Sequence, residues 1–499
     1  MAELGGVDHA SHRLDYAVGD VQRQRPAVGD QRLRADPGRV PADRWLAGRL
    51  YGRGLLFASG IVIFTVGSLL CGVANSSLFL AIARGGQGIG GAIMFATSLA
   101  LLAQAFRGRD RSIALGLFGA ITGIAVAVGP VLGGAITTGL SWRWIFYVNI
   151  PIGVVALAIT LLRVEESRNP DANRPDWAGF VTFSAALAGL VYGLIESQRD
   201  GWGSVTVIGS LAASAALLAV FLILERFQKE PMFDLALLRV PTFDGGLVAA
   251  WALSAALFSI LTYLTIYLQN SLGYSAVATG VRFLPLTCAI FVAAAVAGRL
   301  TEMVPRRLLI AAGFLLVGAG LLLMRGLTPT SDWTHLLSGM IVSGLGGGLV
   351  GTPLISTAVG VVAPARAGMA SGINSTLRQV GIATGVATLG TILVSHVRSS
   401  VVDGLSGTAL AGHAHAIAHG ISAGEAPRTI ANAPAPLRGL VAGTARSALV
   451  DGLNTILLIS AVVAFAAAVE SFLLIRERDF VTAEAEAVGE EQVELPMAA

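Results

Sequence analysis

Charged residues are scarce in this chain. Asp, Glu, Lys and Arg together make up 13% of its 499 residues, and Lys229 is the only lysine. Soluble domains carry roughly 25% charged residues, so this composition excludes an ordinary soluble globular protein. The formal net charge is only +3, and the basic residues fall between apolar segments, so nucleic-acid binding is not indicated.

Cysteines and clustered metal ligands are also rare. Cys71 and Cys288 both lie within apolar segments, which excludes a disulfide framework and a cysteine metal site. His413, His415 and His419 have metal-like spacing, but without an acidic partner we interpret them as solvated loop residues. Apart from these histidines, no loop gathers the acids or histidines that a polytopic membrane enzyme would need. We therefore expect no enzymatic activity, no metal and no cofactor.

Apolar segments of membrane-spanning length dominate the sequence, which is 54% hydrophobic. A helix of about 20 residues crosses the ~30 Å hydrocarbon core of a bilayer. About twelve segments qualify and predict an all-α integral membrane protein. They cover residues 55–74, 78–106, 112–140, 143–164, 176–197, 205–228, 243–268, 276–300, 308–326, 334–361, 367–397 and 449–475.

The basic residues of the connectors predict the orientation of these spans, because positive residues stay on the cytoplasmic side. One set of alternate connectors holds Arg107, Arg109, Arg111, Arg163, Arg168, Arg174, Arg226, Lys229, Arg239, Arg306, Arg307 and Arg366. The opposite set of short connectors holds only Arg143, Arg199 and Arg325. The first set is therefore predicted inside, together with the tail from Arg476. Residues 398–448 contain no spanning run and are predicted to form a long extracytoplasmic loop.

Several polar residues lie inside the predicted spans. Arg84 is followed one turn later by Gln87, and a charge in an apolar helix costs several kcal/mol and is functional by default. We therefore predict a buried polar role for Arg84 rather than an arginine that snorkels to the headgroups. Arg378 and Gln379 lie well inside another span and are predicted to line a cavity. Glu196 and Glu470 lie near span ends and are interpreted as solvated.

Glycine and proline are combined in the predicted span 112–140. Gly129 precedes Pro130, and Gly133 and Gly134 follow one turn later. A Gly-Pro pair bends a spanning helix, and small residues let a neighbouring backbone come close. This pattern is typical of a membrane transporter whose spanning helices move relative to one another.

A short sequence repeat indicates duplicated halves. Ala297-Gly298-Arg299-Leu300 repeats Ala47-Gly48-Arg49-Leu50, and both precede a predicted span. The first copy is shorter and has no counterpart of Glu302. Secondary transporters use such duplicated halves to build two gates around a central site. The candidate gate-loop residues are Gly48, Arg49, Gly52, Arg53, Gly298, Arg299, Glu302, Arg306 and Arg307.

Together these motifs resemble the major facilitator superfamily, in particular the fourteen-span drug:proton antiporters of the EmrB/QacA-like group. The resemblance covers about residues 46 to 478 and has four parts. The loop motif G-x-L-a-D-r-x-G-r-r resembles Gly48, Leu50, Gly52 and Arg53, and the motif R-x-x-q-G-x-g-a resembles Arg84, Gln87, Gly88, Gly90 and Gly91. The antiporter motif G-x5-G-P-x2-G-G resembles Gly123, Gly129, Pro130, Gly133 and Gly134. A late motif of the family resembles Ala370 to Asn374 followed by Leu377 to Gly381.

The resemblance implies two pseudo-symmetric bundles of six spans, with two linking spans near 176–197 and 205–228. It also implies a plasma (inner) membrane monomer that exports small amphiphilic or cationic drugs, or natural products, in exchange for protons by alternating access. The partners would be the substrate, the proton and the lipid bilayer. Arg84 would assist proton transfer or hold a backbone carbonyl, with Gln87, Gly88 and the antiporter glycines in gating. Asn374, Arg378 and Gln379 would line the cavity.

The N-terminal stretch departs from this family. Relatives carry two further spans before the loop motif, whereas residues 1–46 interleave Arg and Asp without an apolar run. We hypothesise that a frameshift replaced the first two spans, and a disordered cytoplasmic extension is the alternative. The chain could then be an inactive truncated fragment of an exporter. A facilitator of another substrate class is a further alternative.

The predicted domain organisation follows from these features. It comprises an aberrant polar N-terminus (1–46), the rest of the N-terminal bundle (47–164), two linking spans with a cytoplasmic loop (165–240), most of the C-terminal bundle (241–397), the long extracytoplasmic loop (398–448), the last span (449–478) and a cytoplasmic tail (479–499).

Overall fold

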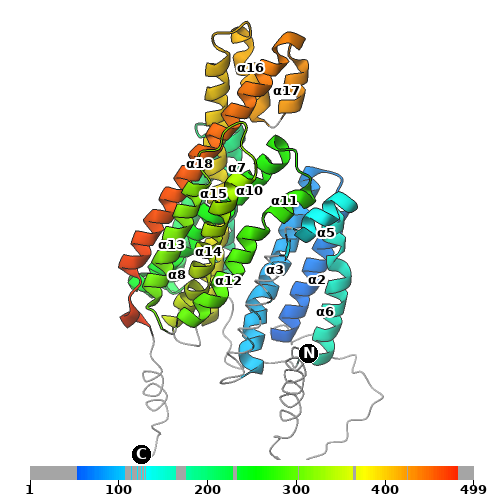
Figure 1. The fold of residues 1–499 in the computed structure, drawn as a ribbon. Helices are drawn as coiled ribbons and strands as arrows, with labels where there is room; N and C mark the ends of the chain where they lie inside the picture. Colours follow the sequence, from blue (N-terminus) through cyan, green and yellow to red (C-terminus); the bar gives the residue numbers. More distant parts are fainter. Residues whose placement is uncertain are drawn as a thin grey trace, which may run out of the picture. The chain divides into compact units, whose positions relative to one another are not determined.

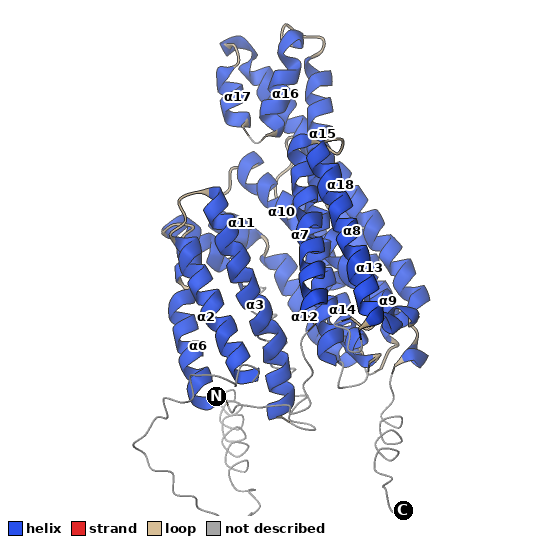
Figure 2. Cartoon of the chain, turned by 180° about the vertical axis from the view of Figure 1, so that it is seen from behind, coloured by secondary structure: helices blue, strands red, loops and turns tan. Residues whose placement is uncertain are grey.

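The computed structural model describes residues 53–106, scattered positions between 114 and 129, and residues 131–164, 176–228, 233–301, 303–362, 367–423 and 425–480. Every regular element in these ranges is a helix (Figures 1 and 2), which confirms the predicted all-α class. The aberrant segment 1–46 lies outside these residues.

The helices of the first part of the described chain are α2 (Arg53–Gly72), α3 (Ser77–Ala105), α5 (Trp144–Tyr147), α6 (Asn149–Arg163), α7 (Trp177–Asp200), α8 (Val205–Phe227) and η2 (Leu235–Arg239). They are followed by α9 (Pro241–Leu253), η3 (Ser254–Phe258), α10 (Ser259–Ile266), η4 (Tyr267–Ser271), α11 (Ala276–Arg282), α12 (Leu284–Leu300), α13 (Arg306–Leu323) and α14 (Thr334–Gly360). The last elements are α15 (Ala367–Leu405), η6 (Ala411–His413), α16 (Ala414–Ser422), α17 (Ala426–Asn432), η7 (Ala435–Leu437), α18 (Arg438–Leu474) and η8 (Glu477–Asp479).

Eleven helical segments within the described ranges are long and apolar enough to cross a membrane. Each corresponds to one of the predicted spans. The remaining predicted span, 112–140, is described only at scattered positions up to 129 and over residues 131–140.

Small residues bring α2 and α3 into close contact. A Cβ on Gly67 would lie 2.7 Å from the Cα of Gln87, and a Cβ on Gly90 would lie 2.8 Å from the Cα of Phe64. Neither position has room for a larger side chain. Close packing of small residues is the usual way in which spanning helices associate, since lipid removes the hydrophobic drive between them. α6 packs on the same α2 helix.

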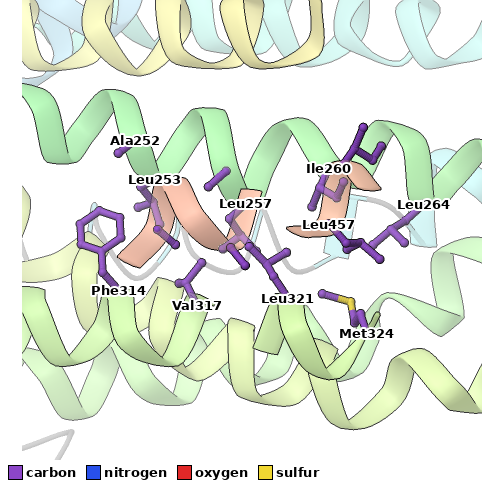
Figure 3. Close-up of a cluster of buried hydrophobic side chains, with 14 of the residues drawn as sticks. Ala252, Leu253, Leu257, Ile260, Leu264, Phe314, Val317, Leu321, Met324 and Leu457 are labelled. Atoms are coloured by element: carbon purple, nitrogen blue, oxygen red, sulfur yellow. The ribbon is translucent and has the colours of Figure 1, made fainter. Parts of the chain in front are cut away.

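The largest apolar core surrounds the span that begins with α9. Leu253, Leu257 and Ile260 meet residues of α13, and Leu457 of α18 completes the contact (Figure 3). Phe314, Val317 and Leu321 of α13 are all fully buried there. This core fixes the position of the span against which α15 packs.

Two π-helical turns interrupt this span. The segment Pro241–Ser271 is 31 residues long, and its regular α-helix is broken by η3 and by η4. The hydroxyl of Ser259 donates to the carbonyl of Ser254 at 3.1 Å and to the carbonyl of Ile382 on α15 at 3.1 Å. π-Turns are rare and occur frequently at functional sites.

Residues 398–448, predicted to form a long loop, are mostly helical. α15 continues to Leu405 and α18 begins at Arg438, while α16 and α17 fill the segment between them (Figure 1). We call residues 406–437 the cap. Its alanines favour helix, and its apolar residues bury against the ends of α15 and α18 in a separate cluster that includes Val401, Ala418 and Val441. The absence of a spanning run was compatible with these short helices. The extracytoplasmic side of the cap stays a prediction.

Candidate transport site

A buried polar network joins α3 to α2. The amide Nε2 of Gln87 donates to Ser68 Oγ at 2.7 Å, and Arg84 Nη1 donates to Gln87 Oε1 at 3.1 Å. Asn149 Nδ2, at the start of α6, donates to the same Ser68 Oγ at 3.5 Å. Gln87 is 4% exposed and Ser68 is fully buried. The network therefore places hydrogen-bonding groups from three helices inside an apolar bundle.

Arg84 itself is exposed, which differs from the prediction of a buried arginine. Its guanidinium lies 5.7 Å from the centroid of the Phe146 ring. A long arginine side chain can start from an exposed backbone position and still deliver its charged end to a partner. The group desolvated in the network is therefore the amide of Gln87, and the charge sits at the edge of the network.

A second arginine ties α5 to the end of α2. Arg143 Nη2 donates to the carbonyl of Ala74 at 2.9 Å, and the guanidinium lies 4.7 Å from the Trp142 ring centroid. This contact satisfies a carbonyl at a helix end, where backbone acceptors lack partners.

The antiporter-motif glycines differ in their surroundings. A Cβ on Gly134 would lie 2.5 Å from the carbonyl oxygen and 2.8 Å from the carbonyl carbon of Ala276, the first residue of α11. Around Gly129, Gly133 and likewise Gly88, such a Cβ would meet no heavy atom of the described residues within 4 Å. Pro130 lies outside the described residues. Close backbone approach, predicted for the motif as a whole, thus occurs at Gly134.

The structure describes part of the candidate gate loops. Gly48, Arg49, Gly52 and Glu302 lie outside the described residues, and Arg53 is described only as the start of α2. Gly298 and Arg299 form the exposed last turn of α12.

The remaining gate candidates contact the end of α18 and the segment that follows it. The backbone N–H of Arg306 donates to Glu477 Oε1 at 2.7 Å, and its guanidinium lies 4.0 Å from the Phe480 ring centroid. Arg307 lies 5.6 Å from the ring of Phe472. These contacts were not predictable from the sequence, because η8 and α13 are far apart along the chain.

Three polar residues on α15 were predicted to line a cavity. Asn374 is 4% exposed, and its Nδ2 has no hydrogen-bond partner within the described part of the chain. Arg378 is half-buried, and its guanidinium lies 6.0 Å from the Phe258 ring centroid. Gln379 is exposed. Asn374 and Arg378 therefore face protein, whereas Gln379 does not.

Sequence reasoning missed two features of the C-terminal spans. Trp251 Nε1 donates to Thr384 Oγ1 at 3.0 Å, and the hydroxyl of Tyr263 donates to the carbonyl of Val386. Glu470, interpreted as solvated, has one buried carboxyl oxygen without a partner among the described residues. Its other oxygen accepts a long hydrogen bond of 3.4 Å from Ser471 Oγ. Helix α18 packs on α9 at this level, and that contact buries the carboxyl.

Many apolar spans, a hydrogen-bond network buried between them and glycine-mediated contacts define a polytopic helical membrane transport protein. Comparison with known protein families identifies the family to which it belongs. The family model of the Major Facilitator Superfamily matches residues 38–386, and the chain belongs to this superfamily. It is therefore a multi-pass protein of the plasma (inner) membrane and a transport protein rather than an enzyme, as predicted.

Curated relatives are named as resistance and export proteins. Multidrug resistance protein Stp of Mycobacterium tuberculosis is 37% identical over 70% of this chain and 66% of its own length. The chain thus spans just under two thirds of that relative. Puromycin resistance protein pur8 of Streptomyces alboniger is 35% identical over 75% of this chain and 76% of its own. Cephamycin export protein CmcT of Amycolatopsis lactamdurans is 34% identical over 74% and 81%.

A solved structure shares the fold. The inward-facing, occupied crystal structure of a bacterial homolog to the human lysosomal transporter Spinster matches with a TM-score of 0.50. It is 15% identical and covers 88% of this chain and 85% of its own. Together with the family match, this confirms the predicted major facilitator fold.

Proposed function

We propose that this protein exports small amphiphilic drugs or natural products across the plasma membrane in exchange for protons. The observation that carries the proposal is the network in which Gln87 and Ser68 are buried between the apolar spans α3 and α2, with Arg84 at its edge. Polar and charged groups are costly there and mark transport pathways or proton relays. Relatives named for multidrug resistance, puromycin resistance and cephamycin export support a drug or antibiotic as substrate.

Alternating access is the mechanism that the helix contacts favour. Glycine packing makes α2 and α3 a unit that has little room to deform. The contact between Gly134 and Ala276 joins a segment that precedes the linking helices α7 and α8 in the sequence to one that follows them. A small residue at such a contact lets two bundles approach and separate, as transporters with repeated halves require. We propose the same two-bundle division for this chain, as a fourteen-span-type antiporter acting as a monomer.

Proton exchange needs a carboxyl group that titrates inside the protein. Glu470 is the candidate, because it lies in a span and one of its oxygens is buried without a cation or hydrogen-bond donor among the described residues. A Cβ on Gly245 of α9 would lie 3.4 Å from that oxygen. Movement of α9 against α18 would therefore change the exposure of this carboxyl directly.

The experiment is proton-dependent efflux of ethidium from cells that express the full chain. We expect efflux that an uncoupler abolishes, and a loss of efflux in Gln87→Leu at unchanged membrane expression. Ser98→Ala is the matched control, because Ser98 lies on the same helix and, among the described residues, its hydroxyl bonds only to the carbonyl of Phe95 at 2.9 Å. Efflux by Gln87→Leu equal to that of the control would remove the network from the mechanism.

Two alternatives give different results in the same cells. An inactive fragment of an exporter would show no efflux of any dye. A facilitator for another substrate class would leave dye efflux absent but would take up its own substrate.

The frameshift hypothesis for residues 1–46 is tested on the DNA. Translation of all three frames across the codons for residues 1–55 should reveal two apolar spans and an Asp before Tyr51. If no frame contains them, the polar stretch is the natural sequence.

A further inference from the structure

Arg378 is a charged residue in a span without a charged partner. It belongs to the spanning segment Met369–Leu405, and its guanidinium lies 6.0 Å from the centroid of the Phe258 ring. Within the described ranges, the only ion pair closer than 4.0 Å joins Arg478 and Asp479, far from this position. Charged residues in membranes usually pair with one another or with backbone carbonyls. The five N–H donors of Arg378 therefore lack an acceptor in the described protein.

Asn374 presents a second donor beside it. Residues four positions apart on a helix lie on the same face, so Asn374 is the direct neighbour of Arg378. Its side chain is 4% exposed, and the buried Nδ2 has no acceptor within the described residues. Most buried polar groups in native proteins are hydrogen-bonded, and exceptions need an explanation. Two adjacent donors, one charged and one neutral, are left without an acceptor on the same face.

Two aromatic side chains of the span that begins with α9 lie beside α15, one of them next to Arg378. Phe258 belongs to the π-turn η3, and Trp251 lies two turns earlier in the same span. The indole N–H of Trp251 is already bonded to Thr384 on α15 at 3.0 Å, which holds the ring beside α15. An apolar wall next to paired donors matches a molecule with an acidic group and an apolar body.

We propose that Arg378 and Asn374 bind a carboxylate of the transported molecule, with the apolar body of that molecule against Phe258. A guanidinium and a carboxylate form two parallel hydrogen bonds, and the amide of Asn374 supplies another. Binding neutralises a charge that is otherwise unpaired among the described residues. The site therefore accepts amphiphilic organic acids, which adds a substrate class to the proposed export function on which this inference rests.

The test compares a carboxylic acid with its uncharged ester. The full chain is purified into lipid nanodiscs, and binding of dansyl-phenylalanine and of its methyl ester is followed by dansyl fluorescence. We expect the acid to bind about 10-fold or more tightly than the ester, as for a hydrogen-bonded charge pair. Arg378→Gln should abolish this preference by weakening the acid alone. Asn374→Leu should weaken the acid less, and Arg378→Lys should retain part of the preference.

Arg398→Gln is the matched control. Arg398 lies on the same helix, and its Nε donates to Ser422 Oγ at 3.0 Å. This variant should bind the acid like the unaltered chain. Thermal unfolding of each variant shows whether it folds. If Arg378→Gln does not fold, binding of the acid and the ester by Arg378→Lys and Asn374→Leu decides the outcome.

Three results would overturn the inference. These are equal binding of acid and ester, no measurable binding of either, and equal weakening of both by Arg378→Gln. Ethidium efflux distinguishes a failure of this inference from a failure of the proposed export function. Efflux without a preference for the acid refutes the inference alone, whereas a binding preference dependent on Arg378 without any efflux refutes only the export function.

Discussion

Gly134 packs directly against the carbonyl group of Ala276. A Cβ on this glycine would lie 2.5 Å from the carbonyl oxygen, so no other residue fits without a shift of α11. We predict that Gly134→Val reduces ethidium efflux several-fold at unchanged expression. Gly133→Val is the control, because a Cβ at Gly133 meets nothing within 4 Å. Equal efflux by the two variants would show that the contact is not used in transport.

The pairing of Gln87 with Ser68 should be visible as a stability effect. Ser68→Ala leaves the buried amide of Gln87 without its 2.7 Å partner, which costs about 1–3 kcal/mol. Gln87→Leu removes the amide as well, so the double variant should be less destabilised than the sum of the single variants. Thermal unfolding in nanodiscs measures all four proteins. Strict additivity would mean that the two side chains do not interact.

Asn454 of α18 holds the turn between α13 and α14. Its Oδ1 accepts from the N–H groups of Gly326 at 2.9 Å and Leu327 at 3.1 Å, and its Nδ2 donates to the carbonyl of Leu327 at 2.9 Å. Asn454→Ala should lower stability by about 1–3 kcal/mol, because the half-buried turn loses its partners. Thr455→Ala is the control, since in the part of the chain that the structure describes that hydroxyl bonds only within its own helix. A shift in Tm no larger than that of Thr455→Ala would contradict the prediction.

Glu470 should be required for proton coupling but not for folding. We expect Glu470→Gln, which keeps the shape of the side chain but cannot ionise, to lose proton-driven efflux while its thermal stability stays near that of the parent. Glu425→Gln, in the exposed part of the cap, is the control. Efflux driven by an imposed pH gradient in vesicles provides the measurement. Full pH-driven activity in Glu470→Gln would exclude this carboxyl as the proton carrier.

Features that depend only on the order of residues along one helix could be predicted from the sequence. The spans follow from continuous apolar runs, and the pair of Arg84 and Gln87 follows from helical spacing. The partners of Gln87 were not predictable in this way. Ser68 lies 19 positions from Gln87, and Asn149 lies 81 positions from Ser68, so only the packing of three helices brings them together.

The same limit explains the incorrect expectations. Glu470 was interpreted as solvated because it lies near a span end, and its burial depends on α9, which precedes it by more than two hundred residues. The cap was predicted as a loop because a search for spanning runs is insensitive to helices of seven to nine residues. Exposure of Arg84 was missed because spacing on a helix does not determine which face meets a neighbour.

The π-turn at η3 has a consequence for the register of the span that contains it. One residue of an α-helix corresponds to about 100° of rotation, and a π-turn accommodates one extra residue without shifting the helix beyond it. Deleting a single residue between Ser254 and Phe258 would therefore restore a continuous α-helix and keep Tyr263 facing α15. Deleting a residue from the regular turn at Ala249–Leu253 would instead rotate everything downstream and turn Tyr263 away. Length polymorphism in natural relatives should consequently be tolerated at η3 and excluded one turn earlier.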